Sequence, residues 1–411
     1  MQAQESIGAI GNTPAAASTP SLLDRIFKLG EHDTTVRTEV IAGITTFLTM
    51  AYIVFVNPHI LGDAGMPKGA VFVATCLIAA LGAVFISGCL FLVVTLTGLR
   101  ELIVRGIPHS LRTAIAVGIG LFLALIALKS AGIVAPSQAT YVTLGDLHQP
   151  QVVLAAIGFL LIVVLDRLKV PGAILVGILA VTLLSFVFGG NHFGGVFSAP
   201  PSIAPTLFAL DIHGALQAGI VNVVLVFFLV ELFDATGTLM GVAKRAGLLV
   251  PGRMGRMNKA LLADSGAIFA GSLLGTSSTT AYIESAAGVQ AGGRTGLTAV
   301  TVAVLFLLCL TISPLAGSVP AYATAPALFF VACLMLRELV DLDWDETTEV
   351  VPAAVTALAM PFTYSIANGL AVGFITYAAL KLFTGRMREV HPMVWLIAGV
   401  FLFRFVWMGG H

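Results

Sequence analysis

Apolar runs close to twenty residues long recur along almost the whole chain, and they limit its fold more than any other feature. Crossing the hydrocarbon core of a bilayer as an α-helix takes about 20 apolar residues. Of the 411 residues, 58% are hydrophobic and 10% are charged, whereas a soluble protein carries roughly 25% charged residues. The sequence therefore predicts an all-α polytopic membrane protein, with apolar segments at about 36–61, 70–98, 112–131, 152–166, 172–189, 215–242, 261–276, 279–291, 296–318, 322–340, 350–363, 366–384 and 392–408.

Charge and cysteine content argue against several other kinds of protein. The net charge is zero, so no overall electrostatic feature favours a nucleic-acid partner. The four cysteines lie within apolar segments and form no CxxC pair, which argues against a disulfide framework or a metal site. We therefore expect the chain to bind no nucleic acid, no metal and no cofactor, and to be surrounded by the lipid bilayer.

The distribution of Lys and Arg predicts how the chain is oriented in the membrane. Loop 243–260 carries five basic residues and no acid, so it is expected to face the cytoplasm, as are the basic stretches 100–112 and 167–169. Between Val170 and Ala243 there is no Lys or Arg, and the Pro- and Gly-rich stretch 190–213 is accordingly predicted to be external. Counting the crossings back places the N-terminus, residues 1–34, as a cytoplasmic tail of a multi-pass protein of the cell (inner or plasma) membrane.

Two acidic residues interrupt the apolar segment 215–242. A carboxylate at mid-membrane costs ~2.5–3.5 kcal/mol, so chains retain one where it faces a cavity or a partner. Glu231 and Asp234 are three residues apart, and Asp234 and Thr238 are four apart, so all three share one face of a helix. This spacing predicts one wall of a polar site inside the membrane. The alternative for Glu231 is that it only braces its own helix.

A second polar region lies at 275–285. Hydroxyl residues occupy positions 276–280 in succession, and Tyr282 and Glu284 follow. Because such a run is unfavourable within a helix and against lipid, segment 279–291 is predicted to be unwound and to lead into a half-helix, not to cross the membrane alone. The first N–H groups of a half-helix can donate to a ligand. The alternative is that the hydroxyls serve helix–helix packing.

We expect these regions to meet around a small planar heterocycle. Asp234 and Glu284 would accept its hydrogen bonds, or donate when protonated, and Tyr282 or Phe47 would stack on its faces. A carboxylate in such a pocket can load and release a proton as the site opens to each side, so Asp234, Glu284 and Glu231 are also the predicted proton-coupling residues. The alternative is that nearby hydroxyl and backbone groups satisfy both carboxylates.

Three other charged features have simpler expected roles. Asp264 is expected to cap the start of its helix. The acidic run 341–349 is expected to be a solvated loop, and Arg404 to be a snorkelling or packing residue within the last apolar segment.

Four motifs resemble those of one known family. They are the stretch from Arg37 to Pro58, Phe233-Asp-Ala-Thr-Gly-Thr238, Gly275-Thr-Ser-Ser-Thr-Thr280 and the stretch from Met360 to Gly369. On these motifs the chain is similar, from about residue 24 to 390, to the AzgA-like purine permeases, which belong with the nucleobase:cation symporters that share the uracil-permease fold. The resemblance implies proton-coupled uptake of guanine, hypoxanthine or adenine, with a purine nucleobase and a proton as partners. It leaves open whether the chain works as a homodimer.

The resemblance also implies an architecture of fourteen spans in two inverted seven-segment repeats, with substrate held between a core and a gate domain. After the tail 1–34, the first repeat would supply core-domain residues 35–98 and gate-domain residues 104–189. The second repeat would supply core-domain residues 215–318 and gate-domain residues 322–384, followed by a C-terminal apolar segment at 392–411. The implied and argued substrate-binding residues are Asp234, Glu284, Thr238, Ser278, Thr279, Thr280, Tyr282, Thr46 and Phe47.

The first repeat departs from the family pattern. Residues 71–82 resemble the second span of the family and residues 83–98 resemble its fourth, so the third transmembrane segment is missing between them. The stretch 70–98 has room for one tilted helix only. One crossing then replaces the second, third and fourth crossings of the family pattern, which shortens the first repeat to about five spans. Because the number of crossings lost is even, every later loop stays on its predicted side of the membrane.

Two other functions compete with transport of purines. A transport-deficient relative, lacking half of the substrate site, would keep the fold and carry nothing. An intramembrane enzyme would use Glu231 or Asp234 as its catalyst, but the sequence has no Ser/His, Cys/His or HExxH constellation to accompany them. We therefore expect a transporter with no catalytic residue.

Overall fold

The computed structural model describes residues 22–63, 68–78, 106–191, 193–208, 228, 231–232, 235, 238–239, 242–243, 246–250, 253–254, 257–275, 281–282 and 284–407. In chain order its elements are α1 (Leu22–Phe27), η1 (Gly30–His32), α2 (Val36–Met50), α3 (Ile53–Asp63), α4 (Lys68–Ile78), α7 (His109–Ser130), β1 (Val134–Ser137), β2 (Tyr141–Leu144), α8 (Pro150–Arg167), α9 (Ala173–Phe188), β3 (Leu249–Val250), β4 (Arg253–Met254), α12 (Met257–Leu274), α13 (Ser285–Gln290), α14 (Gly296–Cys309), η3 (Leu310–Ile312), α15 (Ser313–Gly317), α16 (Ala321–Met335), η4 (Leu336–Asp341), α17 (Thr347–Phe362), α18 (Ile366–Phe383), η5 (Met387–Glu389) and α19 (Pro392–Trp407).

Apolar helices dominate this structure, and the predicted all-α polytopic class is confirmed. Three shorter apolar helices, α9, α17 and α19, accompany the longer ones. Within the described residues, six helical stretches are long and apolar enough to cross a membrane: Val36–Pro58, His109–Ser130, Pro150–Arg167, Gly296–Gly317, Ala321–Asp341 and Ile366–Phe383.

Polar side chains fix where several of these helices begin. The hydroxyl of Thr35 accepts a hydrogen bond from the Thr38 N–H at the start of α2, and Ser365 does the same for Asn368 at the start of α18. The Glu346 carboxylate caps α17 by accepting from Thr348 N–H. Each cap satisfies a backbone donor that has no partner within its own helix.

Three of the predicted apolar segments are interrupted in the structure, and these interruptions matter for the site. The predicted segment 36–61 divides into α2 and α3 at Ala51 and Tyr52. The predicted segment 296–318 divides into α14, η3 and α15, where Pro314 stands in the first turn of α15 and has no N–H to continue the preceding helix. Helix α13 is only six residues long, in agreement with the half-helix predicted from the sequence.

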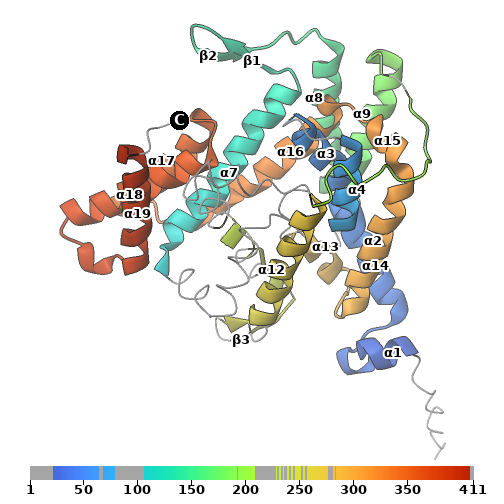
Figure 1. Ribbon diagram of the computed structural model, residues 1–411, viewed down its shortest axis with the longest axis horizontal. Coiled ribbons are helices and arrows are strands. Elements are labelled where there is room, and N and C mark those ends of the chain that lie inside the picture. Colours follow the sequence, from blue (N-terminus) through green and yellow to red (C-terminus); the bar gives the residue numbers. More distant parts are fainter. Residues whose placement is uncertain are drawn as a thin grey trace, which may run out of the picture.

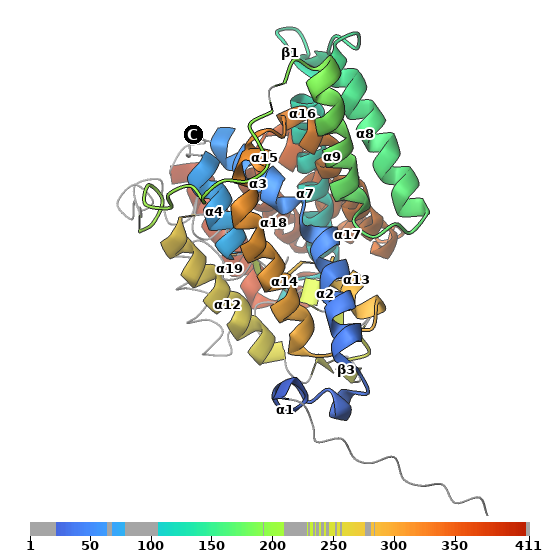
Figure 2. The same cartoon turned by 90° about the vertical axis from the view of Figure 1, so that its right-hand side faces the viewer.

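The described helices pack in two groups, each built from two distant parts of the chain (Figure 1). Helix α7 lies between α16 and α17, α8 and α9 pair beside α16, and α18 packs on α17. In the other group α2 lies along α13 and α14, while α4 contacts α3, α12 and α15. Contacts from α3 to α16 and from α2 to α9 join the two groups. Figure 2 shows α2, α13 and α14 close together, with α1 at the lower end and the β1–β2 hairpin at the opposite end.

Two large apolar clusters form the interior. The first contains Tyr52, Phe55, Phe72 and Phe306 with residues of α8, α9 and α16, and therefore ties the two groups together. The second contains Leu111, Met360, Phe374 and Phe401 and holds α7, α17, α18 and α19 against one another. Apolar side chains that point away from these clusters, especially on α8 and α9, are exposed, as expected for helices that face lipid.

Candidate functional site

The candidate site is built where the break in the first span faces the start of α13. Glu284 directly precedes α13, and its Oε1 accepts a 2.9 Å hydrogen bond from the hydroxyl of Tyr52. Tyr52 stands at the break between α2 and α3 and is only 6% exposed. Glu284 itself is half-buried. The structure therefore holds a carboxylate at an irregular part of the backbone, with one oxygen bound by a buried phenol.

Close packing on α2 fixes the position of the short helix that follows Glu284. Gly288 of α13 lies directly against Thr46 of α2, so closely that a Cβ at position 288 would overlap the Thr46 hydroxyl and lie 3.0 Å from the Ala42 carbonyl oxygen. Thr46 is buried and donates its hydroxyl to that same carbonyl at 2.9 Å. Only glycine leaves room for this approach, so Thr46, predicted to bind substrate, forms part of the α2–α13 contact.

Two aromatic residues predicted at the site have identifiable surroundings. Phe47 meets Phe306 of α14 edge-on, with ring centroids 5.1 Å apart. Tyr282 is half-buried and packs against the apolar cluster that contains Tyr52. Tyr282 and Glu284 thus lie on the same short stretch of chain, next to the break in the first span.

Glu39 is a polar residue that the sequence reasoning did not single out. It is completely buried, and its carboxylate accepts hydrogen bonds from the N–H groups of Arg294 and Thr295 and from the hydroxyls of Thr34 and Thr298. These bonds join the first turn of α2 to the connection between α13 and α14. The sequence did contain a signal for this role: Glu39 is an acid in the first apolar segment, and no basic residue lies one helical turn away to pair with it.

The third wall of the predicted site is only partly described. Glu231 is buried at 4% exposure, and Thr238 is half-buried, in the helical stretch that also contains Leu232 and Ala235. Asp234, Ser278, Thr279 and Thr280 lie outside the described residues.

Two of the simpler charge assignments are settled by the structure. Asp264 is buried two turns into α12, which starts at Met257, so the prediction that it caps the start of a helix is wrong. The predicted apolar segment starts at residue 261 because Asn258 and Lys259 interrupt the apolar pattern, but both residues lie in the first turn of α12. Arg404 is buried and donates to the Asn368 side chain at 3.1 Å, as expected for a packing residue.

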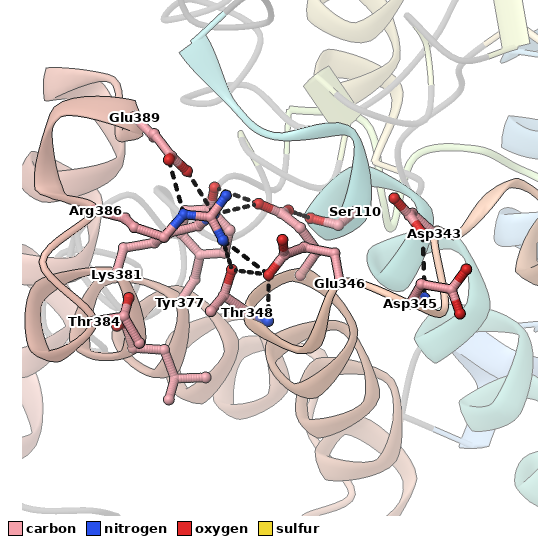
Figure 3. Close-up of polar contacts among 12 residues, drawn as sticks. Ser110, Asp343, Asp345, Glu346, Thr348, Tyr377, Lys381, Thr384, Arg386 and Glu389 are labelled. Carbon is pink, nitrogen blue, oxygen red and sulfur yellow. Dashed lines mark hydrogen bonds and ion pairs between the residues drawn. The ribbon is translucent and has the colours of Figure 1, made fainter.

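The third charged feature is the acidic run 341–349. The prediction that it is a solvated loop is wrong for some of its residues. Asp341, Asp343 and Asp345 are exposed, but Glu349 binds the buried Lys381 of α18 at 2.9 Å and accepts from the hydroxyls of Ser110 and Tyr377. The rest of this cluster is made by Glu346, Arg386 and Glu389, as Figure 3 shows. Folding brings the basic end of α18 onto the acidic start of α17, which spacing along the chain did not indicate.

Comparison with known proteins assigns the chain to a family. A family model described as "Permease family" matches residues 74–372. "Putative permease MJ0326" of Methanocaldococcus jannaschii is 47% identical over 94% of this chain and 99% of its own length. "Adenine permease AdeP" of Escherichia coli is 44% identical over 96% and 98%. "Guanine/hypoxanthine permease PbuO" of Bacillus subtilis is 41% identical over 92% and 98%.

The alignment lengths show that relatives are longer than this chain. The match to the Methanocaldococcus protein runs for 431 positions but takes in 94% of the 411 residues. About 45 aligned positions therefore have no residue here, which is close to two ~20-residue spans with a turn. That these positions correspond to the third segment of the first repeat stays a prediction, since residues 79–105 lie outside the described part of the chain.

Solved structures agree on the fold. "The transmembrane domain of a cyanobacterium bicarbonate transporter BicA" matches with a TM-score of 0.54 at 17% identity, covering 82% of this chain and 97% of that one. "The overall structure of SLC26A9" matches with a TM-score of 0.63 at 12% identity, covering 88% and 67%. The predicted inverted-repeat transporter fold is confirmed by these matches. The family model and the full-length relatives together establish that this chain belongs to the permease family of membrane transporters and is not an enzyme.

Proposed function

We propose that this protein is a secondary active transporter that takes up purine nucleobases together with protons across the cytoplasmic membrane. One observation carries the proposal: at 44% and 41% identity, relatives that align along nearly their full length are named adenine permease and guanine/hypoxanthine permease. A purine ring system is planar and carries several hydrogen-bonding groups at its edge. A site that binds it needs acceptors and donors in the ring plane and apolar surfaces against its faces.

The geometry around Glu284 supports this choice of substrate. Its carboxylate lies at a break in regular structure, where the backbone of a transporter can approach a ligand. Tyr282 is two residues away and can cover a ring face. We propose that Asp234 and Thr238, with Ser278, Thr279 and Thr280, supply the remaining polar groups, while Thr46 and Phe47 hold the α2 side of the site in place.

Proton coupling is proposed to use the acids at membrane depth. Glu231 is buried at 4% exposure and Glu284 is half-buried, and acids retained within apolar segments of a transporter commonly mark the path of a proton. Together with Asp234, these acids can take up a proton when substrate enters and release it when the site opens to the other side.

The two packed groups of helices support a core and a gate domain. One group consists of α2, α3, α4, α12, α13 and α14, and it includes the two helices, α2 and α13, between which the candidate site is built. The other group consists of α7, α8, α9, α16, α17 and α18 and contacts the first. We propose that they move against each other during transport. Helix α1 and strand β3 lie at one end and the β1–β2 hairpin at the other (Figures 1 and 2). Because β3 belongs to the loop 243–260, which is rich in basic residues, this arrangement supports a cytoplasmic N-terminus.

Uptake of radiolabelled hypoxanthine, guanine and adenine by cells that express this chain tests the proposal. We expect accumulation above the empty vector that an uncoupler abolishes. Accumulation that resists the uncoupler would remove the proton from the mechanism. A chain that reaches the membrane but accumulates none of the three purines would be a relative that has lost transport, and the proposed function would be wrong.

A further inference from the structure

The hydroxyl of Tyr52 is held in one place by the way its ring is packed. The ring belongs to the first apolar cluster, together with Met50, Phe55 and Phe306. The carbonyl of Tyr52 accepts from the N–H groups of Phe55 and Val56, at 3.0 Å each, so the Tyr52 backbone is fixed by the first turn of α3. A buried ring on a fixed backbone leaves the phenol hydroxyl little freedom.

The partner of this hydroxyl is fixed less firmly. Glu284 is half-buried and precedes a helix of six residues, and a helix this short has little stability of its own. Among the residues that the structure describes, Tyr52 is the only one whose side chain donates a hydrogen bond to the Glu284 carboxylate. The 2.9 Å bond is made to Oε1, and a carboxylate has a second oxygen that can accept further hydrogen bonds.

Two further contacts hold α13 to α2 without touching the Glu284 carboxylate. Gly288 packs against Thr46 one turn after Glu284, and Glu39 binds the N–H groups of Arg294 and Thr295 beyond the end of α13. These contacts set the position of the helix backbone. They do not set the rotation of the Glu284 side chain, which the Tyr52 hydroxyl and the backbone N–H of Glu284 itself restrain through hydrogen bonds.

We propose that Tyr52 is a positioning residue for substrate: it orients the Glu284 carboxylate so that its second oxygen faces the bound nucleobase. This inference rests on the proposed function and adds to it a residue of the first span that acts through Glu284. A hydrogen bond to a charged group is stronger than one between neutral groups. Binding to a carboxylate that is already oriented also avoids the entropy of ordering it. Tyr52 therefore strengthens substrate binding without contacting the substrate.

The variant Tyr52→Phe tests this, because it keeps the ring in the apolar cluster and removes only the hydroxyl. We expect the apparent KM for the transported purine to rise about tenfold, with a maximal rate within about twofold of the unmodified protein and an unchanged amount of protein in the membrane. Tyr322→Phe is the matched control: its hydroxyl is buried and makes no hydrogen bond to the described residues, so KM should not change. A merely structural defect would lower the maximal rate or the amount of protein, not raise KM alone.

Binding to purified protein separates action through Glu284 from other effects. The affinity for the purine is measured for Tyr52→Phe, Glu284→Gln and the double variant, by calorimetry or by thermal stabilisation at graded purine concentrations. We expect Tyr52→Phe to weaken binding in the unmodified background and to have no further effect when Glu284 is already Gln. Equal weakening in both backgrounds would show that Tyr52 does not act through Glu284, and the inference would be wrong.

The outcomes also separate this inference from the proposed function. If the unmodified chain transports a purine and Tyr52→Phe has the same KM as Tyr322→Phe, only the role of Tyr52 is overturned. If the unmodified chain neither binds nor transports any purine, the proposed function fails and the role of Tyr52 fails with it.

Discussion

The hydroxyl of Thr298 on α14 donates a 2.6 Å hydrogen bond to the carboxylate of Glu39 on α2, although 259 residues separate the two positions. The same carboxylate accepts the N–H groups of Arg294 and Thr295 just before α14. A buried carboxylate is tolerated when several donors satisfy it. Glu39 therefore joins the start of the first span to the start of α14 and frames the short helix that carries Glu284.

Removing the Glu39 carboxylate should destabilise the protein. Glu39→Ala would remove the acceptor of two part-buried backbone N–H groups and leave the Thr298 hydroxyl only the Glu39 carbonyl, and we expect the free energy of unfolding to fall by about 2 kcal/mol. Denaturant unfolding of the purified protein in detergent measures this. Glu31→Ala is the control, since Glu31 forms an exposed ion pair with Lys28, worth about 0–1 kcal/mol. Equal stability of the two variants would contradict the role of Glu39.

A methyl group at position 288 should disturb the site without touching the substrate. In Gly288→Ala the new Cβ would overlap the Thr46 hydroxyl, so α13 must shift away from α2 and carry Glu284 with it. We expect uptake to fall at least about tenfold, since displacement of a site by about 1 Å can cost a hundredfold. Gly399→Ala in α19 is the matched control, because a Cβ there meets nothing within 4 Å. Normal uptake by Gly288→Ala would show that the α2–α13 contact tolerates adjustment.

The two acids proposed to bind substrate should both be needed for transport. Asp234→Asn and Glu284→Gln keep the size of each side chain but remove its charge and its ability to exchange a proton. We expect each variant to abolish uptake, measured with radiolabelled purine, while membrane expression stays normal. A variant that retains normal uptake would exclude its residue from the mechanism.

The buried lysine of the charged cluster should be important for stability. The Lys381 side chain is 2% exposed and bonds Glu349 at 2.9 Å and Glu389 at 3.0 Å. Removing one partner of a fully buried ion pair costs about 3–5 kcal/mol. Because the Glu349 and Glu389 side chains are 23% and 46% exposed, Lys381→Met should lower the free energy of unfolding by less, about 1–2 kcal/mol. Adding Glu349→Gln to this variant should recover some of the loss, because the uncompensated carboxylate is then gone. Lys28→Met, at an exposed lysine, should have little effect, and a similar loss in both would argue against the pairing.

Acid should weaken the same end of the protein in a defined pH range. Hydrogen bonds from Thr348, and then from Arg386, lower the pKa of Glu346 from 4.5 to about 2. A carboxylate with a lowered pKa stabilises the fold fully above about pH 4.5, and this contribution is lost as the pH falls towards about 2. Between pH 6 and pH 3, the melting temperature of Glu346→Gln should therefore fall less than that of the unmodified protein. Asp341→Asn removes an exposed carboxylate outside the cluster, and its melting temperature should fall as much as that of the unmodified protein.

Much of the candidate site was predictable from residue types, but its internal contacts were not. The short helix after Glu284 follows from five polar residues before it, because such a run cannot continue a lipid-facing helix. The burial of Glu231 follows from its position in an apolar segment. By contrast, the roles of Thr46 and Glu39 depend on which helix lies against α2. The misplaced cap at Asp264 arose because hydropathy detects where apolar residues begin, whereas a helix starts where its backbone hydrogen bonds start.

The sequence by itself determined that this protein is a bundle of apolar helices, which family it belongs to, and which acids interrupt its apolar segments. Those properties are local, since a membrane helix satisfies its backbone hydrogen bonds within its own segment. Only the tertiary structure decided that Tyr52 meets Glu284 across 232 residues, that Gly288 fits against Thr46, and that Lys381 lies between two acids. Such pairs depend on how helices from distant parts of the chain pack together. That packing is set by the close fit of individual side chains, which the apolar pattern of the sequence does not reveal.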